Sequence, residues 1–118
     1  MPRKVLIVDD ALTHRTALAQ IVTGAGHVVV LATTGQEAIE RARKEKPDLI
    51  LMDVNMPDLD GFAATRQLKA DAQTRNIRIV LVSSKGERAD KVWGQMLGAS
   101  AYVTKPYQPD QILAQLEA

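Results

Sequence analysis

The chain has 118 residues, of which 46% are hydrophobic and 25% are charged, a composition typical of one soluble globular domain spanning residues 1–118. With 15 basic and 14 acidic residues the formal net charge is +1, which gives no electrostatic reason to expect a nucleic-acid or membrane partner. The absence of cysteine excludes disulfides, thiolate metal sites and a cysteine nucleophile. No apolar run is long enough for a transmembrane helix or a signal peptide, so we expect a cytoplasmic protein.

Five short apolar runs recur along the chain and predict five strands. Between them lie segments of 17 to 26 residues, each long enough to hold a helix and two loops. Strands that alternate with helices indicate βαβ units and a parallel sheet. The predicted strands are Val5–Val8, Val28–Leu31, Leu49–Met52, Ile79–Val82 and Ala101–Val103.

Helical patterns fill the first three intervening segments. An apolar stripe from Ala17 to Val22 predicts the first helix, which Gly24 ends. Thr34 and Glu37 have the spacing of a capping box, which predicts the start of the second helix. A third helix is expected to begin near Gly61.

The fourth helical pattern contains a glycine. Ser84 and Glu87 have capping-box spacing, and we expect Trp93 and Met96 behind them to be core residues rather than a binding site. Gly94 costs about 1 kcal/mol relative to Ala in a helix. It indicates either a less rigid helix or close packing against a neighbour.

A last apolar stripe follows Pro109, which suits a first helical turn, and completes five strand–helix pairs. Right-handed crossovers in such a chain favour an α/β fold with a doubly wound parallel sheet of strand order 2-1-3-4-5. The first and third strands are then neighbours at the topological switch point, where sheets of this kind bind ligands.

Asp53 stands at the end of a strand, Leu49–Met52, whose continuous apolar character predicts burial on both faces. An ionisable group at that position is costly unless a charge partner accompanies it. We therefore interpret Asp53 as the reactive residue. The alternative is an Asp that only caps the following helix.

Two more carboxylates, Asp9 and Asp10, end the first strand and should converge with Asp53 at the switch point. Like charges this close repel one another unless a cation lies among them. Oxygen ligands without His or Cys select a hard ion, and Mg²⁺ suits one or two carboxylates with a backbone carbonyl and waters. The loop after Asp53 can supply that carbonyl, for which Asn55 is our candidate.

The fourth and fifth strands bring a hydroxyl and an ammonium group, from Ser83 and Lys105, to the same edge. A carboxylate nucleophile, a divalent ion, a hydroxyl and a fixed cation are the parts needed to transfer a phosphoryl group to an Asp. Taken singly, Ser83 has a second interpretation as a helix cap and Lys105 as a solvated lysine.

These motifs together resemble the CheY-like receiver domains of bacterial two-component response regulators, over essentially the whole chain. Such a resemblance implies a flavodoxin-like (βα)5 fold and a signalling switch that catalyses only its own phosphorylation and dephosphorylation. The run from Asp90 to Gly94 is further similar to stand-alone PilH-type regulators of twitching motility. The motifs are Val-Asp9-Asp10, Met-Asp53-Val-Asn-Met-Pro-Asp-Leu-Asp-Gly, Val-Ser83-Ser84 and Tyr102-Val-Thr-Lys105-Pro106.

The resemblance implies that a histidine kinase or phosphotransfer domain phosphorylates Asp53. It implies that Asp10, Asp53 and the Asn55 carbonyl ligate Mg²⁺ directly, while Asp9 acts through water. It also implies that Ser83 and the Lys105 side chain bind the phosphoryl group.

The resemblance also implies which residues take part in switching and which set its rate. Tyr102 would be the aromatic switch partner of Ser83, and the Lys105–Pro106 peptide would be cis. The output surface for a downstream protein would combine the fourth helix, fifth strand and fifth helix. Lys85 replaces a familiar acidic residue two positions after Ser83, so we expect it to tune dephosphorylation. His14, at the start of the first helix, is expected to be solvent-exposed.

Other functions remain open at this stage. The chain could be a receiver module trimmed from a larger DNA-binding or hybrid-kinase protein. A Mg²⁺-dependent phosphohydrolase with an Asp nucleophile is disfavoured, because Asn55 replaces the general acid two residues later. A flavodoxin-type FMN binder is weaker still, since acidic residues follow the first strand and would repel a phosphate.

Overall fold

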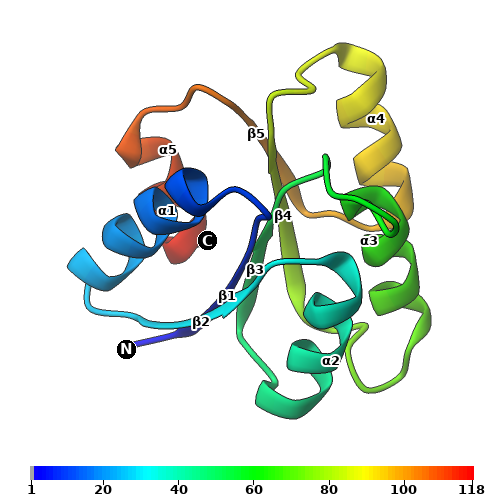
Figure 1. The fold of residues 1–118 in the computed structure, drawn as a ribbon, viewed down its shortest axis with the longest axis horizontal. Coiled ribbons are helices and arrows are strands. Elements are labelled where there is room, and N and C mark those ends of the chain that lie inside the picture. Colours follow the sequence, from blue (N-terminus) through cyan, green and yellow to red (C-terminus); the bar gives the residue numbers. More distant parts are fainter. Residues whose placement is uncertain (1) are drawn as a thin grey trace.

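A computed structural model describes residues 2–118 as a five-stranded parallel sheet between two layers of helices (Figure 1). None of the helices in this part of the chain has the length and apolar character needed to cross a membrane. The strands are β1 (Lys4–Val8), β2 (Val28–Ala32), β3 (Leu49–Met52), β4 (Arg78–Ser83) and β5 (Ala101–Thr104). The helices are α1 (Leu12–Gly24), α2 (Gly35–Glu45), α3 (Gly61–Ala70), α4 (Arg88–Leu97) and α5 (Pro109–Glu117).

The strand order is β2-β1-β3-β4-β5, which confirms the doubly wound α/β fold predicted from the sequence. All four strand pairs are parallel, so the carboxyl ends of the strands meet at one edge. In the register, Val8 of β1 pairs with Met52 of β3, and Ser83 of β4 pairs with Thr104 of β5. The residues that follow these strands are therefore placed side by side.

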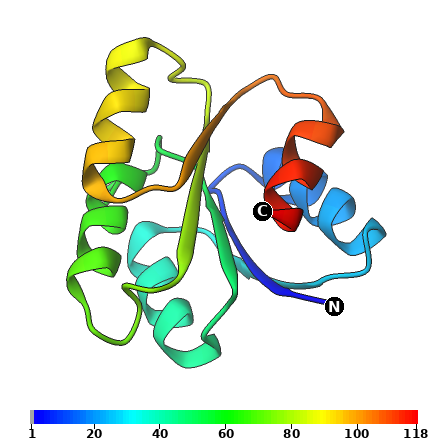
Figure 2. The same cartoon turned by 180° about the vertical axis from the view of Figure 1, so that it is seen from behind.

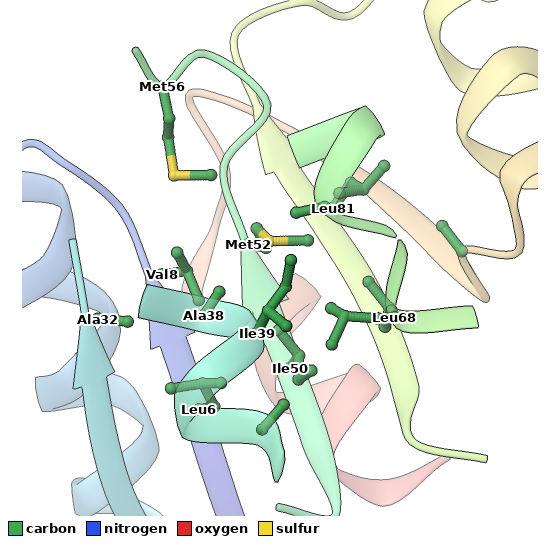
Figure 3. Close-up of a cluster of buried hydrophobic side chains, with 14 of the residues drawn as sticks. Leu6, Val8, Ala32, Ala38, Ile39, Ile50, Met52, Met56, Leu68 and Leu81 are labelled. Atoms are coloured by element: carbon green, nitrogen blue, oxygen red, sulfur yellow. The ribbon is translucent and has the colours of Figure 1, made fainter. Parts of the chain in front are cut away.

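Apolar side chains alternate between the two faces of the sheet and make two separate clusters. The larger one lies beneath α2, α3 and α4, and Figure 3 shows Leu6, Ile50, Met52 and Leu81 within it. The second lies beneath α1 and α5, which cover the opposite face (Figure 2). β3 is fully buried because both clusters enclose it.

The edge strand and the strand ends differ from the predicted runs. β2 is the edge strand next to β1 in the described sheet, and its Val28 and Leu31 side chains are exposed. β3 ends at Met52, so Asp53 is the first residue after the strand rather than its last. Its backbone N–H still donates to the Val8 carbonyl at 2.9 Å, which extends the pairing of the two strands by one residue.

Helix capping follows one predicted pattern and contradicts the other. Thr34 caps α2 as expected, accepting from the Glu37 N–H at 3.0 Å. The predicted capping box between Ser84 and Glu87 is wrong. Glu87 itself is the N-cap of α4 and forms the reciprocal box with Asp90, three residues further on.

The expectation that Trp93 and Met96 belong to the core is also wrong. They are 47% and 72% exposed, respectively, on the outer side of α4. Gly94 is the buried residue of this helix, and a Cβ there would lie 2.9 Å from Leu81 Cδ1. Of the two explanations left open for this glycine, the structure favours close packing.

Candidate functional site

Three carboxylates gather where β1 and β3 end at the topological switch point. Asp9 and Asp53 are buried, with 1% and 7% of their surfaces exposed, while Asp10 is open to solvent. Each offers one carboxylate oxygen, and these oxygens all lie within 4.8 Å of one another. A set of oxygen donors that is partly buried and open on one side fits a hard divalent cation such as Mg²⁺.

Lys105 reaches this cluster from the end of β5. Its Nζ donates to Asp9 Oδ2 at 2.8 Å and lies 3.8 Å from Asp53 Oδ1. Only 10% of its side chain is exposed, so solvent screens these charges weakly. The Lys105–Pro106 peptide is cis. The alternative of a solvated surface lysine does not describe this residue.

The environment of Asp53 disfavours its charged form. Burial raises the pKa of the Asp53 carboxyl above its ordinary value of 3.8, and the neighbouring Asp9 charge acts in the same direction. The Lys105 ammonium and the backbone N–H groups of Val54 and Asn55 oppose this rise in pKa without cancelling it. The Lys105 ammonium and the two backbone N–H groups therefore supply too little positive charge to offset the effect of burial on the Asp53 carboxylate.

The loop after β3 holds the backbone of Asp53 closely. The Val54 N–H donates to Asp53 Oδ1 at 2.8 Å, and the Gly61 N–H donates to the Val54 carbonyl at 2.9 Å. A Cβ on Gly61 would lie 2.3 Å from the Asp53 carbonyl oxygen, so no side chain fits there. Asn55 lies exposed in this loop.

A second group of contacts links the ends of β4 and β5. The Ser83 hydroxyl is fully buried and accepts from the Lys85 N–H at 3.2 Å. The Tyr102 hydroxyl donates to the Lys85 carbonyl, and the Lys105 N–H donates to the Ser83 carbonyl at 2.9 Å. Burial raises the pKa of Tyr102, although hydrogen bonding with the Ser83 hydroxyl partly offsets this rise. Ser83, Lys85 and Tyr102 are therefore one connected unit.

Two α1 residues beside the carboxylates were not predicted as site residues. His14 is exposed as expected, yet its Nδ1 lies 2.8 Å from Lys105 Nζ and 3.8 Å from Asp9 Oδ2. Arg15 Nη1 donates to the Asp9 carbonyl at 2.8 Å. Both stand in the first turn of α1, so their closeness in sequence to Asp9 and Asp10 was the available signal.

A pocket of about 520 Å³ opens beside Lys105, between α1 and the loop that leads into α5. Tyr107, Ala17 and Ile21 give it apolar walls, and His14 and Lys105 lie at its polar side. A macromolecule that reaches Asp53 from this direction therefore meets an apolar surface next to the charged site.

Comparison with known sequences identifies a family. The model of the response regulator receiver domain matches residues 5–117. The chain is 44% identical over 115 residues to protein PilH of Pseudomonas aeruginosa, covering 98% of this chain and 95% of that protein. It is 40% identical to the alkaline phosphatase synthesis transcriptional regulatory protein PhoP of Bacillus subtilis, where it spans 48% of the relative's length.

Solved structures give the same result. The Vibrio cholerae chemotaxis protein CheY4 superposes with a TM-score of 0.92 and 31% identity, covering 99% of this chain and 98% of that one. The receiver domain of a Pseudomonas aeruginosa sensor histidine kinase superposes with a TM-score of 0.90 and 26% identity, covering 99% and 96%. That structure holds a magnesium ion coordinated in its active-site cleft.

Proposed function

Because the chain belongs to the family of response regulator receiver domains, a signalling family, we propose that Asp53 accepts the phosphoryl group that switches it. The observation that carries the proposal is the position of the Asp53 carboxylate. It is buried at the carboxyl edge of the sheet, 3.8 Å from the Lys105 ammonium and beside two further carboxylates.

The proposed step is transfer from a phosphohistidine of a histidine kinase or phosphotransfer domain. An Asp53 carboxylate oxygen attacks phosphorus, the P–N bond breaks, and its electron pair returns to the imidazole nitrogen. Lys105 Nζ neutralises charge on the phosphoryl oxygens, and the Ser83 hydroxyl, whose oxygen accepts from the Lys85 N–H, donates its own proton to one of them. The pocket beside Lys105 offers the donor domain a route to Asp53.

The carboxylates of Asp10 and Asp53, with the Asn55 carbonyl, are proposed to hold Mg²⁺ directly, and Asp9 to act through a water. The support is the donor set itself, which consists of oxygens alone and places two acidic groups next to the proposed nucleophile. When bound, the ion supplies positive charge that offsets both the carboxylates and the incoming phosphoryl group.

The proposed output is the surface formed by α4, β5 and α5. Ser83 and Tyr102 both bond to the Lys85 backbone, so withdrawal of the Ser83 hydroxyl toward a phosphoryl group disturbs the contact that holds Tyr102. Tyr102 lies on β5 beside α4, where a change in its position alters what a downstream protein meets. Tyr102 is therefore the proposed switch.

The pathway is proposed from the likeness to PilH, which we associate with pilus motility control. In this proposal residues 1–118 work as one receiver unit in the cytoplasm, without direct nucleic-acid or membrane binding. The second candidate, a receiver module of a longer regulator, is favoured by the likeness to PhoP, of which this chain spans about half.

Labelling with acetyl phosphate and Mg²⁺ tests the site. One phosphoryl group should be gained per chain, and neither Asp53→Asn nor wild-type protein in excess EDTA should gain it. Asp110→Asn, a change in an exposed acidic residue of α5, is the matched control and should label normally. Full labelling of Asp53→Asn would overturn the assignment.

A further inference from the structure

The imidazole of His14, in the first turn of α1, contacts the Lys105 ammonium. The two nitrogens, His14 Nδ1 and Lys105 Nζ, lie 2.8 Å apart. A lysine ammonium carries only donors, so in this contact Nδ1 accepts and the ring proton of His14 is on Nε2. The imidazole is therefore a hydrogen-bond acceptor for Lys105, a role that the proposed phosphoryl transfer does not use.

Two acceptors hold the Lys105 ammonium at the end of β1 and the start of α1. They are Asp9 Oδ2 and His14 Nδ1, each 2.8 Å from Lys105 Nζ. Asp53 Oδ1 is 3.8 Å from the same nitrogen, which is beyond hydrogen-bond distance. Within residues 2–118, two of the three ammonium N–H groups are therefore engaged, and the third has no acceptor there.

The backbone around Asp9 fixes the places of both acceptors. The Ala11 N–H donates to Asp9 Oδ1 at 2.9 Å, so the carboxylate presents its other oxygen to Lys105. Arg15 Nη1 donates to the Asp9 carbonyl at 2.8 Å, which ties the first turn of α1 to the end of β1. His14 precedes Arg15 in that turn, so its imidazole is held beside the Lys105 side chain.

Loss of the imidazole acceptor would allow the ammonium to move to Asp53. A lysine side chain is flexible, and an ammonium binds a charged carboxylate more strongly than a neutral group. The raised pKa of Asp53 indicates that its carboxylate has too little positive charge around it. We therefore expect that Lys105, without His14, would form a direct ion pair with Asp53 Oδ1.

A direct pair between Lys105 and Asp53 would slow the proposed reaction in two ways. A carboxylate oxygen that accepts a hydrogen bond from an ammonium is a weaker nucleophile, because the bond stabilises its negative charge. The N–H that makes this bond is also no longer available to the phosphoryl oxygens. Separation of the ammonium from Asp53 keeps both the nucleophile and the third N–H free.

We propose that His14 is a positioning residue, which holds the Lys105 ammonium apart from Asp53 so that its third N–H binds the phosphoryl oxygens and not the nucleophile. The consequence for the reaction rests on the proposed phosphorylation of Asp53, whereas the contact between His14 and Lys105 does not. When a phosphoryl group is present, its oxygens give the third N–H a charged acceptor, and His14 keeps its own bond to Lys105.

Two substitutions of His14 separate the acceptor atom from the rest of the side chain. In His14→Asn the carboxamide oxygen stands as many bonds from the backbone as Nδ1 does, so it can accept from Lys105. In His14→Leu the acceptor is lost. Crystals of both variants, grown without divalent cations, should show Lys105 Nζ near 3.8 Å from Asp53 Oδ1 in His14→Asn. In His14→Leu this distance should shorten to about 2.8 Å.

Labelling with acetyl phosphate and Mg²⁺ measures the consequence for the reaction. The rate constant should fall about fivefold in His14→Leu, the equivalent of one net hydrogen bond, and stay within about twofold of wild type in His14→Asn. Thr13→Leu, a change in an exposed neighbour on the same helical turn, is the matched control and should label like wild type.

Three results would overturn the proposal. One is a distance that stays near 3.8 Å in His14→Leu, with water in the place of the imidazole. Another is a distance that shortens in His14→Asn as well. The third is labelling of His14→Leu as fast as, or faster than, that of His14→Asn. Failure of the proposed function has a different signature, because Asp53→Asn would then still be labelled while the two crystal distances kept their expected values.

Discussion

The two halves of the site differ in how well the charges and hydrogen-bonding groups of their side chains are satisfied. In the acidic half, at β1 and β3, carboxylate oxygens crowd within 4.8 Å of one another, and among residues 2–118 the Lys105 side chain is the one ammonium that reaches them. In the hydroxyl half, at β4 and β5, Ser83 and Tyr102 find their partners on the backbone of one residue, Lys85. The acidic half has too little positive charge to balance its carboxylates, whereas both hydroxyl groups of the hydroxyl half already have hydrogen-bond partners.

This difference indicates how the two halves respond to a phosphoryl group and a cation. Adding positive charge to the acidic half relieves existing repulsion, so a cation should stabilise the fold by mass action. A response in the hydroxyl half must instead break hydrogen bonds that are present. We therefore expect the acidic half to control whether the reaction occurs and the hydroxyl half to transmit it.

The strongest test of this comparison is removal of the Lys105 ammonium. Lys105 joins the two halves, because its ammonium contacts Asp9 and its backbone N–H donates to the Ser83 carbonyl. Lys105→Met leaves the Asp9 oxygen, which is almost fully buried, without its ammonium partner, and breaking such a pair costs about 3 kcal/mol of unfolding free energy. Urea unfolding without Mg²⁺ should show this loss, and added Mg²⁺ should restore part of it. Lys91→Met, which removes an exposed lysine that forms no salt bridge within residues 2–118, should change stability by less than about 0.5 kcal/mol. A Lys105→Met protein as stable as wild type would show that the acidic half is not short of positive charge.

A smaller effect of opposite sign is expected for Asp53→Asn. The raised pKa of Asp53 means that the folded protein holds this proton more tightly than the unfolded chain does. Ionisation of Asp53 therefore destabilises the fold as pH rises above 3.8, and the cost is absent below that pH. In Mg²⁺-free buffer at pH 7, Asp53→Asn should melt at a higher temperature than wild type.

The melting difference between Asp53→Asn and wild type should shrink when Mg²⁺ is added or when the pH is lowered below 3.8. The matched variant Asp110→Asn, in the first turn of α5, should be neutral or slightly destabilising, because it removes a favourable charge from a helix N-terminus. If Asp53→Asn lowered the melting temperature at pH 7, the ionised carboxylate would be stabilising rather than strained.

The hydroxyl half is tested by Ser83→Ala. Loss of the hydroxyl should slow labelling of Asp53 about tenfold, equivalent to about 1.4 kcal/mol. It should also reduce the change in amide exchange between Ser83 and Tyr107 on phosphorylation. Ser84→Ala, a change in the exposed neighbouring serine, should leave both unchanged. Protection changes confined to α1 and α2 would show that Ser83 and Tyr102 do not transmit the signal.

The smallest effect concerns the Lys85 side chain, whose backbone links Ser83 to Tyr102. A solvent-screened ammonium near the phosphoryl group should favour its charged form by about 0.5–1 kcal/mol, a few-fold in the rate of hydrolysis. Phosphate release should therefore be slowest in wild type, faster in Lys85→Ala and fastest in Lys85→Glu, with differences that diminish at high salt. Lys91→Glu is the control. If Lys85→Glu retained its phosphate longer than wild type, water positioning rather than charge would control this step.

The parts of the molecule that the sequence predicted are those set by periodicity and chain direction. Four consecutive apolar residues at Leu49–Met52 required a doubly buried strand, and parallel strands necessarily bring Asp9, Asp53 and Lys105 to one edge. The convergence of the carboxylates was thus predictable without any knowledge of side-chain contacts.

The features that the sequence did not reveal depend on how closely backbones approach. Apolar spacing in α4 predicted a helix with an apolar side, but the direction of that side was set by Gly94, which contributes almost nothing to a hydrophobic pattern. The contact of His14 with Lys105 likewise depends on the angle at which α1 leaves β1. Periodicity carries no information about such angles.

The close approach of Gly61 to the Asp53 carbonyl limits which substitutions this loop can accept. Any side chain at position 61 would displace the backbone of the proposed nucleophile, so this position has a single allowed residue. Asn55 and Asp58 stand in the same loop with exposed side chains. Descendants of this chain can therefore vary the exposed side chain of Asn55 beside Asp53, whereas Asp58 has a positive φ of 67° that few residue types other than Gly, Asn and Asp adopt readily. The geometry of Asp53 is inherited unchanged.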